Sequence, residues 1–153
     1  MPHKYSNKNI IRSFDVKMRF ISPYKVLSFT GYKKQSFSDG SCYEGDFVNG
    51  KFHGKGKYTW ANGDVYEGSW SEGLMDGEGI MRQSDGVKFK GTFKAGLKDG
   101  PGILEDADGI RYEGTFHRDQ KNGDFVEKDR NGKVIRKVHY VNGVAQNLQT
   151  SNS

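Results

Sequence analysis

A short aromatic–glycine phrase returns along this chain every 23 residues. Its first clear copy is Tyr43-Glu44-Gly45-Asp46-Phe47, and the later copies begin at Tyr66, Phe89 and Tyr112. A fixed period of this size is the signature of a repeat architecture, in which each unit buries its apolar side against its neighbours. Such proteins present extended surfaces rather than one pocket, so the period favours binding or spacing over catalysis.

Within each unit, aromatic residues and glycines recur at every second position, and this alternation predicts two short β-strands. The first strand carries aromatic residues and a glycine two positions apart: Tyr43, Gly45 and Phe47. The second carries glycines and then aromatic residues at one parity: Gly54, Gly56, Tyr58 and Trp60. Residues two apart share a strand face. Because glycine inside a strand normally costs stability, we expect aromatic rings of one strand to lie over the glycine backbone of the next.

Two series of dipeptides mark the bends between strands. Asn-Gly and Asp-Gly pairs predict two-residue hairpin turns in which both central residues have positive φ. These pairs are Asn62-Gly63, Asp85-Gly86, Asp108-Gly109 and Asn131-Gly132. The opposite bends fall at Asn49-Gly50, Glu72-Gly73 and Ala95-Gly96. The fold class is therefore all-β, an antiparallel meander in which each unit advances roughly 10 Å.

The period also divides the chain. We expect a basic N-terminal arm at residues 1–19, a repeat array at 20–143 and a disordered polar tail at 144–153. The units of the array are a degenerate copy at 20–42, clear copies at 43–65, 66–88, 89–111 and 112–134, and a terminal partial copy at 135–143. Terminal repeats are commonly atypical because they cap the array. Strict alternation over residues 14–20 predicts a strand, and a helix using Ile10, Phe14, Met18 and Ile21 is the alternative.

Charge is distributed unevenly along the chain. The formal net charge is +5, yet residues 43–134 carry 14 basic against 17 acidic side chains. The basic excess lies mainly in residues 1–42, with eight basic and two acidic side chains. Such an arm is suited to phosphates, lipid headgroups or an acidic protein, or serves only to keep the chain soluble. We find no long apolar run and expect neither a signal peptide nor a transmembrane span.

The repeated phrase resembles the MORN (membrane occupation and recognition nexus) repeat. Tyr66-Glu67-Gly68-Ser69-Trp70, followed by Gly73, Gly77 and Gly79, carries the resemblance. It covers residues 43–134 well and 20–42 loosely. The resemblance implies an elongated, twisted ribbon or solenoid of stacked antiparallel β-hairpins. It also implies a scaffold, a membrane tether or a regulatory segment. Choline-binding cell-wall modules are a weaker alternative, since their phrase differs.

The sequence contains no convincing active site, so we expect no enzyme, no cofactor and no metal. The four histidines share no metal-ligand spacing. His53 is expected to lie in a loop. Cys42 has no potential general base at a recurring spacing, so we expect it to be a small side chain of the core. The glycines of Gly54-Lys55-Gly56-Lys57 follow from the repeat and lack the spacing of a phosphate-binding loop.

The expected function is a non-enzymatic scaffold or protein-interaction module of a cytoskeletal or ciliary (axonemal) assembly in the cytoplasm. The assembly and location rest on the resemblance alone. The module would grip a partner peptide or helix along its aromatic–glycine face, and a homodimer through an edge strand is a further expectation. Candidate partner-binding residues are Phe47, Tyr58, Trp60, Tyr66, Trp70, Phe89, Phe93, Tyr112 and Phe116. For any single one of them, burial in the core is favoured over exposure.

The alternative function is a peripheral membrane tether. Basic side chains near an anionic phospholipid surface contribute roughly 1 kcal/mol each. The candidate contacts, with lipid or with an acidic partner, are Lys4, Lys8, Arg12, Lys17 and Arg19. Nucleic-acid binding ranks last, because the aromatic residues lie in the acidic part of the chain.

Overall fold

The structure is a computed structural model that describes residues 28–146. The expected basic arm at 1–19, with its five candidate contacts, lies outside the described residues. So do the segment 10–21, for which a strand and a helix were both considered, and the end of the tail at 147–153.

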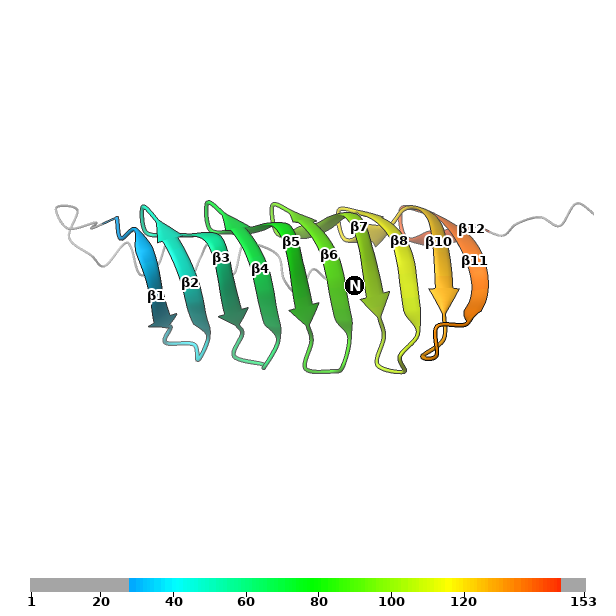
Figure 1. The fold of residues 1–153 in the computed structure, drawn as a ribbon, viewed down its shortest axis with the longest axis horizontal. Coiled ribbons are helices and arrows are strands. Elements are labelled where there is room, and N and C mark those ends of the chain that lie inside the picture. The colour runs from blue at the N-terminus through cyan, green and yellow to red at the C-terminus, as the bar shows by residue number, and fades with distance from the viewer. Residues whose placement is uncertain (1–27, 147–153) are drawn as a thin grey trace, which may run out of the picture.

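Residues 28–146 form one antiparallel sheet, in which the described strands follow one another in chain order (Figure 1). The strands are β1 (Gly31–Ser36), β2 (Cys42–Val48), β3 (Lys51–Thr59), β4 (Val65–Ser71), β5 (Leu74–Arg82), β6 (Lys88–Lys94), β7 (Leu97–Glu105), β8 (Arg111–His117), β9 (Gln120–Lys121), β10 (Gly123–Lys128), β11 (Val134–Val141) and β12 (Val144–Gln146). Only β9 leaves this path, since it pairs with β8 alone. The all-β meander predicted from the period is confirmed.

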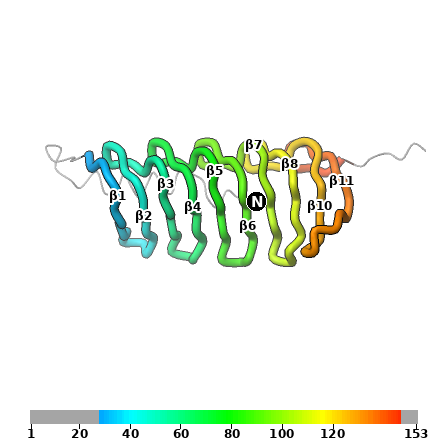
Figure 2. Tube along the Cα trace, viewed as in Figure 1, coloured from blue at the N-terminus to red at the C-terminus, as the bar shows by residue number. Residues whose placement is uncertain are grey.

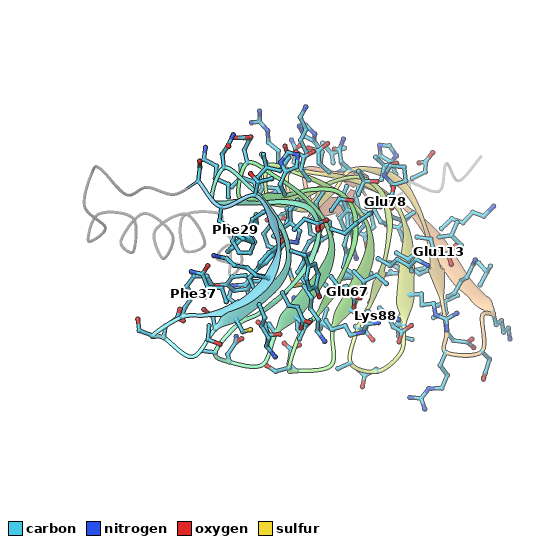
Figure 3. The ribbon with its side chains drawn as sticks, turned by 60° about the vertical axis from the view of Figure 1, so that its left-hand side comes forward. Phe29, Phe37, Glu67, Glu78, Lys88 and Glu113 are labelled. Carbon is cyan, nitrogen blue, oxygen red and sulfur yellow. The ribbon has the colours of Figure 1, made fainter. Side chains whose placement is uncertain are left out.

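The sheet is an elongated ribbon one layer thick, and each strand curls so that one face is hollow (Figures 1 and 3). The core lies on this inner face, where Phe29 and Phe37 are seen at the β1 end (Figure 3). Its buried members are Phe37, Tyr43, Phe47, Phe52, Tyr58, Tyr66, Trp70, Met75, Met81, Phe89, Phe93, Phe116, Phe125 and Tyr140. Most are aromatic, and their rings meet mainly edge to face, as in the pair Tyr66–Trp70 with centroids 5.1 Å apart.

A row of glycines crosses the middle of the sheet. In strand after strand, a glycine pairs with a glycine of the next: Gly45, Gly56, Gly68, Gly79, Gly91, Gly102 and Gly114. Aromatic rings occupy the space that side chains would need. A Cβ on Gly56 would lie 2.2 Å from Tyr43 Oη, and one on Gly79 would lie 2.4 Å from Tyr66 Oη. The expectation that rings lie over neighbouring glycine backbone is confirmed.

Two kinds of connection alternate, tight turns along one border and wider loops along the other (Figure 2). In the tight turns both central residues have positive φ, for example Asn49 at 50° and Gly50 at 75°. The equivalent pairs are Glu72-Gly73, Ala95-Gly96, Arg118-Asp119 and Asn142-Gly143. These are the two-residue turns that match the twist of the strands.

The predicted placement of the two-residue turns at Asn62-Gly63 and its equivalents is wrong. There only the glycine has positive φ, 90° at Gly63. The Gly63 N–H donates to the Trp60 carbonyl at 3.0 Å, and the Trp60 N–H donates to the Asp64 carbonyl at 2.9 Å. This is a type I turn closed by a left-handed glycine. Asn62 is suited to it because its Oδ1 accepts the Asp64 N–H at 3.0 Å.

The tight turns also join one unit to the next. The Gly73 N–H donates to the Phe52 carbonyl at 2.9 Å, and the Gly96 N–H donates to the Met75 carbonyl at 2.8 Å. At the far end Gly143 repeats this bond with Lys121 at 2.8 Å. β12 follows that turn, so residues 144–146 extend the sheet into the segment predicted to be a disordered tail. The register was misjudged there because residues 135–143 depart from the repeat pattern.

Candidate interaction surface

The inner face is bordered by two rows of side chains, each with one member per unit. The tight-turn row, next to the tight turns, consists of Phe29, Phe52, Met75, Lys98 and Lys121. The loop row, next to the wider loops, consists of Phe37, Trp60, Gln83, Asp106 and Asp129. Both rows are mainly apolar near β1 and charged near β10. One border therefore ends in lysines and the other in aspartates.

Most of the candidate partner-binding aromatics form the core. Those buried are Phe47, Tyr58, Tyr66, Trp70, Phe89, Phe93 and Phe116, each at most 3% exposed. Only Trp60 and Tyr112 are half-buried and pack against the edge of the core. Buried rings determine the shape of the sheet, whereas a partner can reach Trp60 and Tyr112 without unpacking it. The sequence analysis favoured burial over exposure for each of these residues, and this prediction is confirmed for most of them.

Tyr112 is turned away from the core because its unit lacks one glycine. Phe125 stands where the earlier units have Gly56, Gly79 and Gly102. A Cβ on Gly114 would lie 2.7 Å from the Phe125 ring, so that ring fills the place over the glycine backbone. Tyr112 instead donates from its hydroxyl to Asp106 Oδ2 at 3.1 Å. Sequence parity placed Tyr112 on the correct face but gave no sign of this displacement.

Two lysines of the tight-turn row point over aromatic rings. The Lys121 Nζ lies 3.6 Å from the centroid of Tyr112 and 4.8 Å from that of Tyr140. The Lys98 Nζ lies 5.4 Å from the centroid of Phe89. Burial lowers the pKa of both ammonium groups below the ordinary lysine value. Sequence analysis missed these residues, although their 23-residue spacing from Phe52 and Met75 marks them as inner-face positions.

We expect Lys98→Met to stabilise the protein by about 1 kcal/mol. The substitution removes the desolvation cost of an ammonium group and places a second Met beside Met75. Urea unfolding at neutral pH measures the change, with the exposed Lys94→Met as the matched control. A loss of stability in Lys98→Met would contradict this account of the row.

At the β10–β11 end, a carboxylate is buried on the inner side of the sheet. Glu127 is 4% exposed and accepts the Tyr140 hydroxyl at 2.9 Å and Arg136 Nη2 at 3.2 Å. Burial acts to raise the pKa of Glu127, but the hydrogen bonds from Arg136 and Tyr140 outweigh it and lower the pKa below its ordinary value. Burial and Glu127 together raise the pKa of Tyr140 to about 12.

We expect Glu127→Gln to cost about 1–3 kcal/mol at pH 7, because Arg136 loses its charged partner. The folded-state pKa of Glu127 is depressed, so its contribution is present above the ordinary value of 4.5 and is lost as the pH falls through that region. The stability gap between wild type and variant should therefore shrink between pH 7 and pH about 3. Chemical denaturation at both pH values measures it, with the exposed Glu67→Gln as control. An unchanged gap would contradict the assignment.

The outer face carries opposite charges on neighbouring strands. Lys57 pairs in register with Glu44 on one side and Glu67 on the other. Lys128 Nζ lies 2.7 Å from Glu113 Oε2. The recurring glutamates therefore face away from the glycine row and lie opposite lysines of the neighbouring strands. Exposed pairs of this kind contribute little to stability.

Residues that could carry chemistry do not converge in the described part of the chain. No group of three His, Cys, Asp or Glu side chains suited to a metal ion occurs within residues 28–146. Cys42 is half-buried and alternates with the inward-facing Tyr43, so its prediction as a core residue is wrong. His53 lies in β3 rather than in a loop. The same residues include no helix long and apolar enough to cross a bilayer.

Comparison with protein families finds one match. The model described as MORN repeat matches residues 43–65, 66–88, 89–111 and 112–123. Each match begins at the aromatic residue that the 23-residue period marks. No curated protein sequence matches the chain.

Proposed function

Because the chain belongs to the MORN repeat family, whose repeats serve protein or membrane interaction, we propose that it is a non-enzymatic scaffold of a cytoskeletal or ciliary (axonemal) assembly. It binds a helix or extended peptide of a partner protein along the inner face of the ribbon. The observation that carries the proposal is the pair of continuous rows bordering that face, which offer the same two positions once per unit. A linear surface with a repeated spacing suits a partner that is itself linear.

Trp60 is the residue we assign as the main partner contact in the apolar half of this surface. It is half-buried, its ring centroid lies 4.8 Å from that of Tyr58, and it packs against the core. A large ring held in place by the core loses little freedom on binding, which is typical of interface hot spots. Tyr112, half-buried beside Lys121, takes the corresponding role in the charged half.

Detergent fractionation of cells that carry the tagged chain tests this function. The full chain is compared with a variant lacking residues 1–19, with Trp60→Ala and with Thr59→Ala, which removes the neighbouring side chain on the outer face. We expect the full chain, the truncated chain and Thr59→Ala in the insoluble cytoskeletal pellet, and Trp60→Ala in the soluble fraction. Retention of Trp60→Ala in the pellet would contradict binding through the inner face.

A peripheral membrane tether is the second candidate, favoured by one observation. Residues 1–19 carry Lys4, Lys8, Arg12, Lys17 and Arg19 against the single acidic residue Asp15. Anionic phospholipids attract such a segment within a Debye length of the surface. If detergent releases the full chain, and the chain without residues 1–19 is soluble before detergent is added, the tether is the correct function and the scaffold is not.

A further inference from the structure

Three basic side chains on the outer face of β5 and β6 have no partner of opposite charge. Arg82 of β5 and Lys88 and Lys90 of β6 alternate with the buried Met81 and Phe89, so they point away from the core. Arg82 and Lys90 are exposed, and Lys88 is half-buried. Within residues 28–146, none of these three cationic groups has a carboxylate at ion-pairing distance. Their charges are therefore open to another molecule.

Two of these cations lie directly opposite each other. Arg82 pairs in register with Lys88 across β5 and β6, and like charges in this position destabilise a sheet. The like pair of Arg111 on β8 and Lys128 on β10 is compensated, because each member contacts a glutamate, at 3.0 Å for Arg111 and 2.7 Å for Lys128. The repulsion between Arg82 and Lys88 has no such compensation in the described part of the chain, so an incoming anion would relieve it.

Lys90 reverses a charge that the other clear units keep. At the same position of the repeat those units carry glutamate: Glu44, Glu67 and Glu113. The neighbours of Lys90 in register are apolar, Ile80 on β5 and Ile103 on β7. Ile103 is 39% exposed. A small surface of basic and apolar side chains thus lies over β5–β7, and we call it the outer patch: Ile80, Arg82, Lys88, Lys90 and Ile103.

The segments of the chain outside the described residues do not carry the missing counter-charge. Residues 147–153 contain no charged side chain. Residues 1–27 contain Lys4, Lys8, Arg12, Lys17, Arg19 and Lys25 against the single acidic residue Asp15. Like charges repel, so this basic sequence is not a complement to the outer patch. An anionic group that binds there comes from a second molecule.

Glutamates on both sides limit what can cover the outer patch. The row through Lys90 runs in register from Glu67 on β4 to Glu113 on β8, about 19 Å over four strand spacings. Both glutamates lie on the outer side of the sheet, as Lys88 does (Figure 3). A broad anionic membrane would meet the glutamates as well as the lysines, whereas a single chain that runs along β6 passes between them. The outer patch therefore fits a narrow acidic segment.

We propose that the outer patch binds an acidic segment of a partner protein. Carboxylates of the segment lie against Arg82, Lys88 and Lys90, and its apolar side chains contact Ile80 and Ile103. The charge and the apolar flanks together give the chemistry of this partner: aspartates or glutamates interspersed with a few apolar residues.

This contact is separate from the inner face and goes beyond the function proposed above. It includes neither Trp60, which borders the core, nor Thr59, which lies on the outer face of β3. Exposed ion pairs are individually weak, so the outer patch orients a partner segment and does not hold the chain in an assembly by itself.

Amide NMR of the full chain, titrated at low salt with the peptide Glu-Glu-Leu-Glu-Glu-Leu-Glu-Glu, tests the outer patch. We expect saturable shifts at the amides of Lys88, Lys90 and Ile103, and none with the same peptide carrying lysine in place of glutamate. Low salt is used because screening weakens contacts between exposed charges. Signals of residues 1–19 report separately on any binding to that basic segment.

Matched variants show whether the site is specific. Lys90→Glu should weaken binding at the Lys88 and Ile103 amides at least five-fold, and Lys90→Arg should restore it. Lys94→Glu makes the same change of charge on the same face of β6 but outside the outer patch, so it should change the affinity less than two-fold. Unchanged amide shifts of β2 and β10 serve as the control that each variant stays folded.

Four results would overturn the proposal. One is the absence of shifts at the patch amides, and another is equal loss in Lys90→Glu and Lys94→Glu, which would indicate an effect of net charge alone. If Lys90→Glu instead lowers sedimentation with phosphatidylserine vesicles while the peptide leaves the patch amides unshifted, the outer patch binds a membrane. Self-association of the wild type that Lys90→Glu abolishes would identify a second copy of the chain as the occupant.

Discussion

Replacement of Gly68 by Ala should destabilise the protein by about 3 kcal/mol or more. A Cβ at this position would lie 2.5 Å from the Glu78 carbonyl oxygen and 2.5 Å from the Gly79 Cα. Both atoms are backbone of the neighbouring strand, so no side-chain rotation can relieve the overlap. Strands β4 and β5 would have to separate at the line of glycines that joins all units. Urea unfolding measures the loss.

Gly73→Ala is the matched control for this prediction. Gly73 has a φ of 83°, and a Cβ there would meet no atom within 4 Å. Its cost is only that of left-handed backbone for a residue with a side chain, about 1–2 kcal/mol. If the two variants lose equal stability, then backbone conformation, and not the approach of neighbouring strands, explains the glycines of the repeat.

Replacement of Trp70 by Ala should cost about 3–5 kcal/mol. Trp70 is 2% exposed, and its ring centroid lies 5.4 Å from that of Tyr43 and 5.1 Å from that of Tyr66. Its Nε1–H donates to the Gly56 carbonyl at 3.0 Å. The substitution leaves a cavity between two units and a buried carbonyl without its donor, so both units should lose cooperativity in thermal unfolding.

Trp60→Ala provides the comparison for Trp70→Ala, since Trp60 is the other tryptophan and borders the core. Because Trp60 is half-buried, its loss should cost about 1–2 kcal/mol. We expect Trp60→Ala to remain folded and to lose partner binding, and Trp70→Ala to lose stability. A larger loss of stability in Trp60→Ala would show that the division into core and interaction surface is wrong.

The architecture could be predicted from the sequence because the repeat fixes parity and period at once. Tyr43, Gly45 and Phe47 are two positions apart and so lie on one face of their strand. The same spacing recurs in four successive units, so the aromatic residues of all four units lie on the same face of the sheet, which must be the core. The packing of rings over glycines followed from the same pattern. Glycine weakens a strand, so a repeated glycine inside a strand indicates that a side chain of a neighbouring strand occupies the space above it.

The errors arose where one residue type serves two purposes. Asn-Gly satisfies a two-residue turn, but at Asn62 the side chain is used as an acceptor for the Asp64 N–H and the backbone is not left-handed. The binding candidates were chosen by aromatic character alone, which cannot separate the core from the rim. Exposure of Tyr112 depends on Phe125, which lies in a different strand of the same unit, so the pattern within each strand by itself could not reveal it.

Crosslinking from two adjacent positions of β3 and its loop tests most directly whether the inner face is the interaction surface. A photoreactive residue is placed at Trp60, on the inner face, and in a second variant at Thr59, on the outer face. The account predicts an adduct larger than the chain itself from position 60 in the insoluble pellet and none from position 59. An adduct from position 59 with none from position 60 would place the partner on the outer face and contradict the account.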